Sequence, residues 1–71
     1  GGYCLHIIDK NGNFSVGDIA TRKGLWNDVM HRIIADCNGG FVHRGDNNGY
    51  DDGCFPYDHY TSKVLYSFCI S

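Results

Sequence analysis

The sequence has no glutamate, a single proline and no cluster of basic residues. All eight acidic residues are aspartates, and the six lysines and arginines are scattered along the chain. A protein that binds nucleic acid normally gathers positive charge on one face, so we expect no nucleic-acid partner. No apolar run approaches the roughly 20 residues that a membrane-spanning helix needs, so we expect no membrane span.

Four cysteines are the most informative residues in so short a chain. With 71 residues, the chain is expected to form one domain, residues 1–71, whose apolar core alone gives marginal stability. No two cysteines have the C-x-x-C spacing of a zinc ribbon. An even number is typical of two disulfides and of a secreted, extracellular protein whose leader has been removed. Buried reduced thiols in a cytosolic protein are the alternative. The cysteines are Cys4, Cys37, Cys54 and Cys69.

Residues 18–37 carry the clearest periodic pattern. Their apolar side chains recur at helical spacing and would form one stripe. The helix would begin either at Asp18, a suitable N-cap, or later, after Gly24. Asn38-Gly39-Gly40 is a strong stop signal. The stripe consists of Leu25, Trp26, Val29, Met30, Ile33, Ile34 and Cys37. The pattern therefore predicts a helix that places Trp26 in the core.

Three other segments have the pattern of strands, and one that of a second helix. Residues 3–8, 41–44 and 50–55 are rich in β-branched and aromatic residues and are bounded by turn residues. Asp58 can cap a helix that carries apolar residues on one face, but residues 64–70 alternate equally well as a strand. The order β-α-β-β-α predicts an α+β, ferredoxin-like (split β-α-β) sandwich, with two helices on one face of an antiparallel sheet.

Four short motifs follow one another along this predicted order. They are Asp9-Lys10-Asn11-Gly12, Asp18-Ile19-Ala20-Thr21-Arg22, Asp52-Gly53-Cys54-Phe55 and Tyr66-Ser67-Phe68-Cys69. Their order resembles the subunits of the virus-encoded killer toxins of smut fungi, and secreted fungal effectors of the same fold. The sequence departs from the toxin subunits at residues 23–26, where those subunits carry a further cysteine.

This resemblance implies a function as well as a fold. It makes the last element a helix, and the protein a secreted, non-enzymatic fungal effector or killer-toxin-like protein without a cofactor. Such a protein would act in virulence or as an antimicrobial. Its partners would be a host or competitor protein or cell-surface target, and a second subunit.

Four cysteines allow three disulfide pairings. In the proposed fold, Cys4 begins the central strand, Cys37 ends the first helix near the same edge, and Cys54 lies on a neighbouring strand. This arrangement favours Cys4–Cys69 together with Cys37–Cys54. On the chain-entropy model the first pair, which closes nearly the whole chain, would contribute about 4 kcal/mol.

The candidate recognition loop lies between the second and third predicted strands. It consists of Arg44, Gly45, Asp46, Asn47 and Asn48, and its first three residues are the tripeptide of integrin ligands. Glycine and asparagine are also what a tight or bulged hairpin connection requires, so a solvated turn is the alternative to a binding loop. The aspartates and asparagines do not have the spacing of an EF-hand, and we predict no metal site.

The histidines offer a route to catalysis, although His6, His31, His43 and His59 show no zinc-site spacing. His6 and His43 would approach one another if they lay on neighbouring strands. A histidine pair beside aspartates could serve an acid–base hydrolase such as a ribonuclease. Because the sequence has no catalytic serine motif and few basic residues to hold phosphate, we predict no catalytic residues and no enzyme. A small secreted hydrolase and an RGD-type or other extracellular binding module remain the alternatives.

Overall fold

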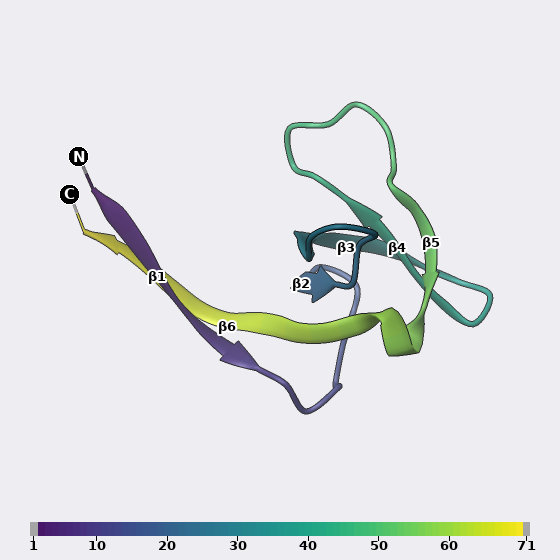
Figure 1. The fold of residues 1–71 in the computed structure, drawn as a ribbon, viewed down its shortest axis with the longest axis horizontal. Coiled ribbons are helices and arrows are strands. Elements are labelled where there is room, and N and C mark those ends of the chain that lie inside the picture. The colour runs from purple at the N-terminus through teal and green to yellow at the C-terminus, as the bar shows by residue number, and fades with distance from the viewer. Residues whose placement is uncertain (1, 71) are drawn as a thin grey trace.

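The structure is a computed structural model that describes residues 2–70, and it shows one six-stranded antiparallel sheet (Figure 1). The strands are β1 (Tyr3–Asp9), β2 (Ile19–Arg22), β3 (Val29–Cys37), β4 (Gly40–Arg44), β5 (Gly53–Pro56) and β6 (Tyr60–Ile70). Over residues 2–70, the helical structure is limited to a short 3-10 turn, η1 (Tyr57–His59). The predicted α+β ferredoxin-like sandwich is therefore wrong, and the protein has an all-β fold.

The strand order in the sheet is β1-β6-β2-β3-β4-β5. Strands β2 to β5 are neighbours in sequence order, whereas β6 pairs with both β1 and β2. The first strand therefore pairs only with the last. Figure 1 shows β1 and its partner stretch of β6 leaving the rest of the molecule as a two-stranded ribbon. We call this ribbon the arm (β1 with residues 63–70) and the remaining strands the body.

Residues 18–37 form the β2–β3 hairpin in place of the predicted first helix. Gly24 lies so close to the backbone of Asn27 that any Cβ at this position would overlap the Asn27 carbonyl oxygen. The chain therefore turns sharply at the point where the helical stripe would continue. The β-branched residues of β3 fit a strand at least as well as a helix. Trp26, which the stripe placed in the core, is 92% exposed on the connecting loop.

Residues 60–70 form strand β6, so the helix implied by the resemblance is also wrong. Periodicity left the strand open for residues 64–70, and the structure extends it back to Tyr60. The sheet partners decide the outcome. β1 pairs with β6 from Tyr3 to Asp9, and β2 pairs with its first residues. These partners make backbone hydrogen bonds with β6 that a helix would make within itself.

The core is small and lies on one face of the body. It consists of Ala20, Ile33, Phe41 and Tyr60, with Phe14 and Phe55 packed against it. Two polar residues, His43 and Ser62, are buried as well. The Tyr60 hydroxyl donates a hydrogen bond to the carbonyl of Phe41, at 2.8 Å. Because a core of this size gives marginal stability, we expect disulfides and polar contacts to carry a large share of it.

Two disulfides link Cys4 to Cys69 and Cys37 to Cys54, the pairing that the sequence favoured. Cys4 and Cys69 lie directly opposite one another in the arm. The second disulfide joins β3 to β5 across β4, so Cys37 sits at the end of a strand and not, as predicted, at the end of a helix. In the described part of the chain, no helix is long and apolar enough to cross a membrane.

Candidate functional site

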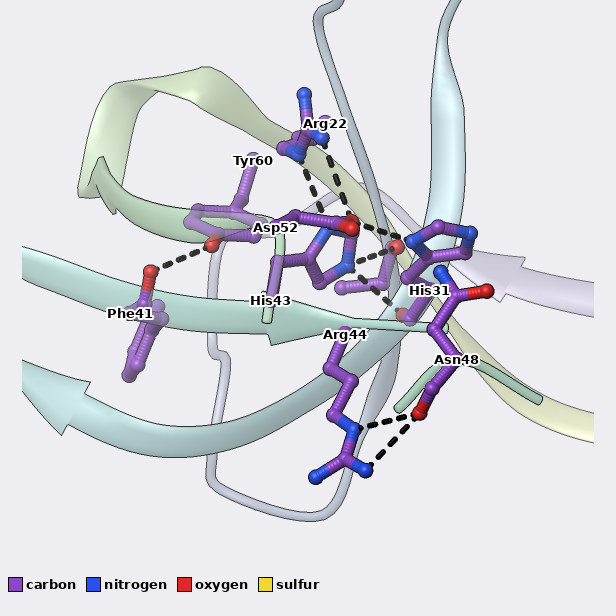
Figure 2. Close-up of polar contacts among 9 residues, drawn as sticks. Arg22, His31, Phe41, His43, Arg44, Asn48, Asp52 and Tyr60 are labelled. Carbon is purple, nitrogen blue, oxygen red and sulfur yellow. Dashed lines mark hydrogen bonds and ion pairs between the residues drawn. The ribbon is translucent and has the colours of Figure 1, made fainter. Parts of the chain in front are cut away.

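The candidate recognition loop is closed by its own side chains. The Arg44 guanidinium donates two hydrogen bonds, through Nε and Nη2, to the carbonyl of Asn48, at 3.0 and 2.9 Å (Figure 2). Asp46 accepts hydrogen bonds from Arg32 of β3, and the bond from the Arg32 Nε is 3.0 Å long. This hydrogen bond and the positive charge of Arg32 hold the pKa of Asp46 below its usual value. Both charged side chains of the Arg-Gly-Asp tripeptide are thus engaged within the domain, a geometry that gives the RGD alternative no support.

Asp52 lies at the end of the same connection and organises a polar network beneath the loop. Its backbone N–H donates to the carbonyl of His43, at 2.7 Å. Its carboxylate accepts a short hydrogen bond from His31 Nδ1 and a longer one, of 3.4 Å, from Arg22 Nη2 (Figure 2). The Arg22 guanidinium is also stacked on the ring of Phe55, 3.9 Å from its centroid. The network therefore links β2, β3 and the β4–β5 connection.

Two opposing effects set the pKa of Asp52. Burial raises the pKa of Asp52, but the hydrogen bonds from His31 and Arg22 and the positive charge of Arg22 outweigh it, so the pKa lies below its usual value. Asp52 is therefore ionised at neutral pH. An ionised carboxylate at His31 Nδ1 fixes the proton of the ring on that nitrogen and leaves Nε2 as the acceptor.

His43 is completely buried at the centre of the network. Its Nε2 lies 2.9 Å from the carbonyl oxygen of Ala20 and 2.8 Å from that of His31, so Nε2 carries the proton and donates to both. Its Nδ1 accepts a hydrogen bond from Arg22 Nε, at 3.1 Å. Burial lowers the pKa of His43 and outweighs the two backbone hydrogen bonds, which raise it, and the nearby charge of Arg22 lowers it further. His43 is thus a neutral core residue with both nitrogens in use.

His31, His43 and Asp52 place one potential metal-ligand atom each within 4.8 Å of one another. The hydrogen bonds do not fit a metal site, because His43 has no free lone pair while Arg22 donates to its Nδ1. Arg22 also places a positive charge beside Asp52. A cation would have to displace this guanidinium, and we infer that the three residues form a structural network.

Above the network lies a hollow of about 410 Å³, which we call the loop hollow. It is lined by the loop residues 45–48 and by Ile19, Met30, His31 and Arg32. A Cβ added at Gly45 would lie 3.0 Å from His31 Nε2 and 2.8 Å from the side-chain nitrogen of Asn48. The ring of His31 and the amide of Asn48 thus meet at the glycine. Among residues 2–70, neither of these two nitrogens has a hydrogen-bond partner.

The histidine pair differs from the predicted one. His6 lies on β1, opposite Ser67, and three strands separate β1 from the β4 strand of His43. The ring that does approach His43 is that of His31, with ring centroids 5.6 Å apart. The predicted approach of His6 to His43 is therefore wrong, because β6 and not β4 is the neighbour of β1.

Sequence reasoning missed the network because the predicted helix left His31 outside its apolar stripe. If residues 29–37 are instead given the alternation of a strand, His31 and Ile33 fall on one face. The pairing of Ala20 with His31 and of Ile33 with His43 then brings Arg22, His31 and His43 to the core face of the body. The signal in the sequence was therefore period-two spacing, which the stronger helical stripe concealed.

No family model, no curated protein and no solved structure matches the chain. The resemblance to killer-toxin subunits therefore stays a prediction, and the fold that it implied is not the fold of this structure.

Proposed function

We propose that the protein is a secreted, non-enzymatic binding protein of the fungal effector or killer-toxin type, and that it binds a host or competitor target at the loop hollow. The observation that carries the proposal is the meeting of two uncommitted polar groups, His31 Nε2 and the Asn48 amide, at Gly45. The two disulfides agree with an extracellular protein, because such bonds persist in oxidising compartments.

The network beneath the hollow supports binding because it holds His31 in one orientation. The ring is fixed by Asp52, which is fixed in turn by Arg22 and by its own backbone bond to His43. Binding sites work best when their polar groups are held in place before the ligand arrives. Because His31 is already held in place, less conformational entropy is lost when a ligand binds.

The chemistry of the hollow suits a neutral group that both donates and accepts. With its proton on Nδ1, His31 offers a lone pair on Nε2, and Asn48 offers N–H donors. A peptide amide or a sugar hydroxyl satisfies both. Ile19 and Met30 add apolar surface, which is the usual composition of a ligand site of this size.

Binding is better supported than turnover. Of the described residues, those lining the hollow include no hydroxyl or thiol nucleophile. The guanidinium of Arg32, which could otherwise hold a phosphate, is bonded to Asp46 and to the carbonyl of Gly17. A hydrolase would need His31 to act on water without a cation to stabilise the charge that develops.

The proposal is tested by measuring the binding of fluorescently labelled protein to fungal and plant cells. We expect saturable binding that unlabelled protein displaces. The Gly45→Ala variant should bind at least tenfold more weakly, because the added methyl group occupies the point where His31 and Asn48 meet. Gly49→Ala is the matched control, since a Cβ at Gly49 has no atom within 4 Å.

Equal binding of the two variants would contradict the loop hollow as the binding site. The absence of saturable binding to either cell type would contradict the effector or toxin function. Turnover of an ester, a phosphodiester or RNA that is lost in the variant His31→Ala would show that the protein is instead a hydrolase.

A further inference from the structure

The arm carries an apolar face that the chain itself does not cover. Three cross-strand pairs of β1 and β6 place six apolar side chains on this face, and each is between 43% and 62% exposed. They are Tyr3 with Ile70, Leu5 with Phe68, and Ile7 with Tyr66. The opposite face carries the Cys4–Cys69 disulfide and the pair His6 with Ser67.

A β-bulge at the base of the arm brings the apolar side chains of β6 onto the same face as those of β1. The register of β1 against β6 shifts between Ile7 and Ile8, so that Ile7 pairs with Tyr66 and Ile8 with Val64. Leu65 is the extra residue. An extra residue moves the following side chains to the other side of the strand. Tyr66, Phe68 and Ile70 therefore lie on one face of the arm, opposite Val64. Because the arm extends beyond the body, the body core does not cover this face (Figure 1).

We propose that the apolar face of the arm is a dimer interface, and that its occupant is the same face of a second copy of this chain. The proposal is independent of the loop hollow, which lies on the body. Two arms would pack face to face as two stacked sheets, about 10 Å apart, related by a two-fold axis. A two-stranded ribbon is marginal alone, and the second ribbon gives it the second layer that a stable sheet face needs.

The exposed area fits a dimer of two such faces. Six half-exposed side chains of this type present about 600 Å², which lies at the top of the range for patches on monomeric proteins. Two faces together would bury about 1,200 Å², the lower limit of stable specific interfaces. The arm face therefore offers a second copy just the area that a dimer requires.

The charge of the face also favours a second copy. None of the six side chains is ionisable at neutral pH. Two identical faces can therefore meet without opposing like charges and without burying an unpaired ion. The opposite edge of the sheet, β5, has only four residues and ends at Pro56, a pattern that discourages association. The apolar face of the arm is thus better suited to a partner than the β5 edge.

The test is the molar mass of the oxidised protein in solution, measured by light scattering after size-exclusion chromatography from 1 to 500 µM. We expect a concentration-dependent rise from 7.9 kDa towards twice that mass. The double variant Leu5→Thr/Phe68→Thr should raise the dimer dissociation constant at least tenfold, and threonine keeps the strand propensity. Leu25→Thr is the control, since Leu25 is 96% exposed but lies outside the arm.

A mass gain of about four units on reduction and an unchanged circular dichroism spectrum would show that both variants are folded. Wild-type protein that stays monomeric over the whole range would overturn the proposal and leave the face to a different partner. An equal loss of dimer in Leu25→Thr would overturn it too, because association would then follow general apolar exposure.

Discussion

His43 is a histidine that the fold uses as a core residue. Its ring lies edge-on to Tyr60, 5.2 Å between centroids, and it donates to two carbonyls while accepting from Arg22. Protonation of Nδ1 would place its N–H against the N–H of Arg22, which now donates to that nitrogen. The one charge there of the opposite sign, Asp52, approaches His43 Nδ1 only to 4.0 Å. The folded structure therefore favours the neutral form of the His43 ring.

Because the folded pKa of His43 is below the ordinary value of 6.5, the unfolded chain binds the proton more tightly. We expect the free energy of unfolding to be highest above pH 6.5 and to fall as the pH drops below it, by at most about 1.4 kcal/mol per pH unit. Urea unfolding between pH 5 and 8 measures this. His43→Gln should flatten the slope, whereas His6→Gln, on the exposed arm, should retain it. An unchanged slope in His43→Gln would assign the acid sensitivity to other groups.

At the scale of the element, the sequence predicted which segments are ordered better than it predicted their type. Residues 3–8 and 41–44 are strands as expected, and the disulfide pairing and the position of the 45–48 loop were also accessible. Residues 25–37 satisfy a helical period and a strand period at once, and only the hydrogen-bond partners β2 and β4 decide between them. Local patterns contain no information on such partners, so the network around Asp52 could not be predicted either.

Strand β4 depends on a glycine where it meets β5. Gly40 pairs with Pro56, and a Cβ at Gly40 would overlap the backbone carbonyl of Phe55. We expect Gly40→Ala to lower the free energy of unfolding by about 3 kcal/mol or more, because backbone atoms must move. Gly49→Ala, in open space, should change it by less than about 0.5 kcal/mol. Similar urea midpoints for the two variants would contradict this close approach.

At the scale of the whole molecule, two covalent loops of very different size hold a small core together. Cys4 and Cys69 are 65 residues apart in the sequence, and Cys37 and Cys54 are 17 apart. The disulfide of the larger loop joins the two strands of the arm, and that of the smaller loop joins β3 to β5 across β4. Neither the core nor the arm has enough buried apolar surface to make these bonds dispensable.

Replacing each disulfide by two alanines should therefore destabilise the protein unequally. On the chain-entropy model, loss of Cys4–Cys69 costs about 4 kcal/mol and loss of Cys37–Cys54 about 3 kcal/mol. Urea unfolding of the two double variants measures the difference. A larger loss for Cys37→Ala/Cys54→Ala would mean that packing around the body disulfide, and not loop closure, dominates its contribution.

The pairing of the first strand with the last has a consequence for how the chain folds. Strands β2 to β5 can form from sequence neighbours, but β1 has no partner until β6 is available, roughly 60 residues later. Until then β1, an uncharged apolar segment as far as Ile8, stays open to other chains. The slowest step and the greatest risk of aggregation during folding should therefore both lie at the closure of the arm, and oxidation of Cys4 with Cys69 would make that closure permanent.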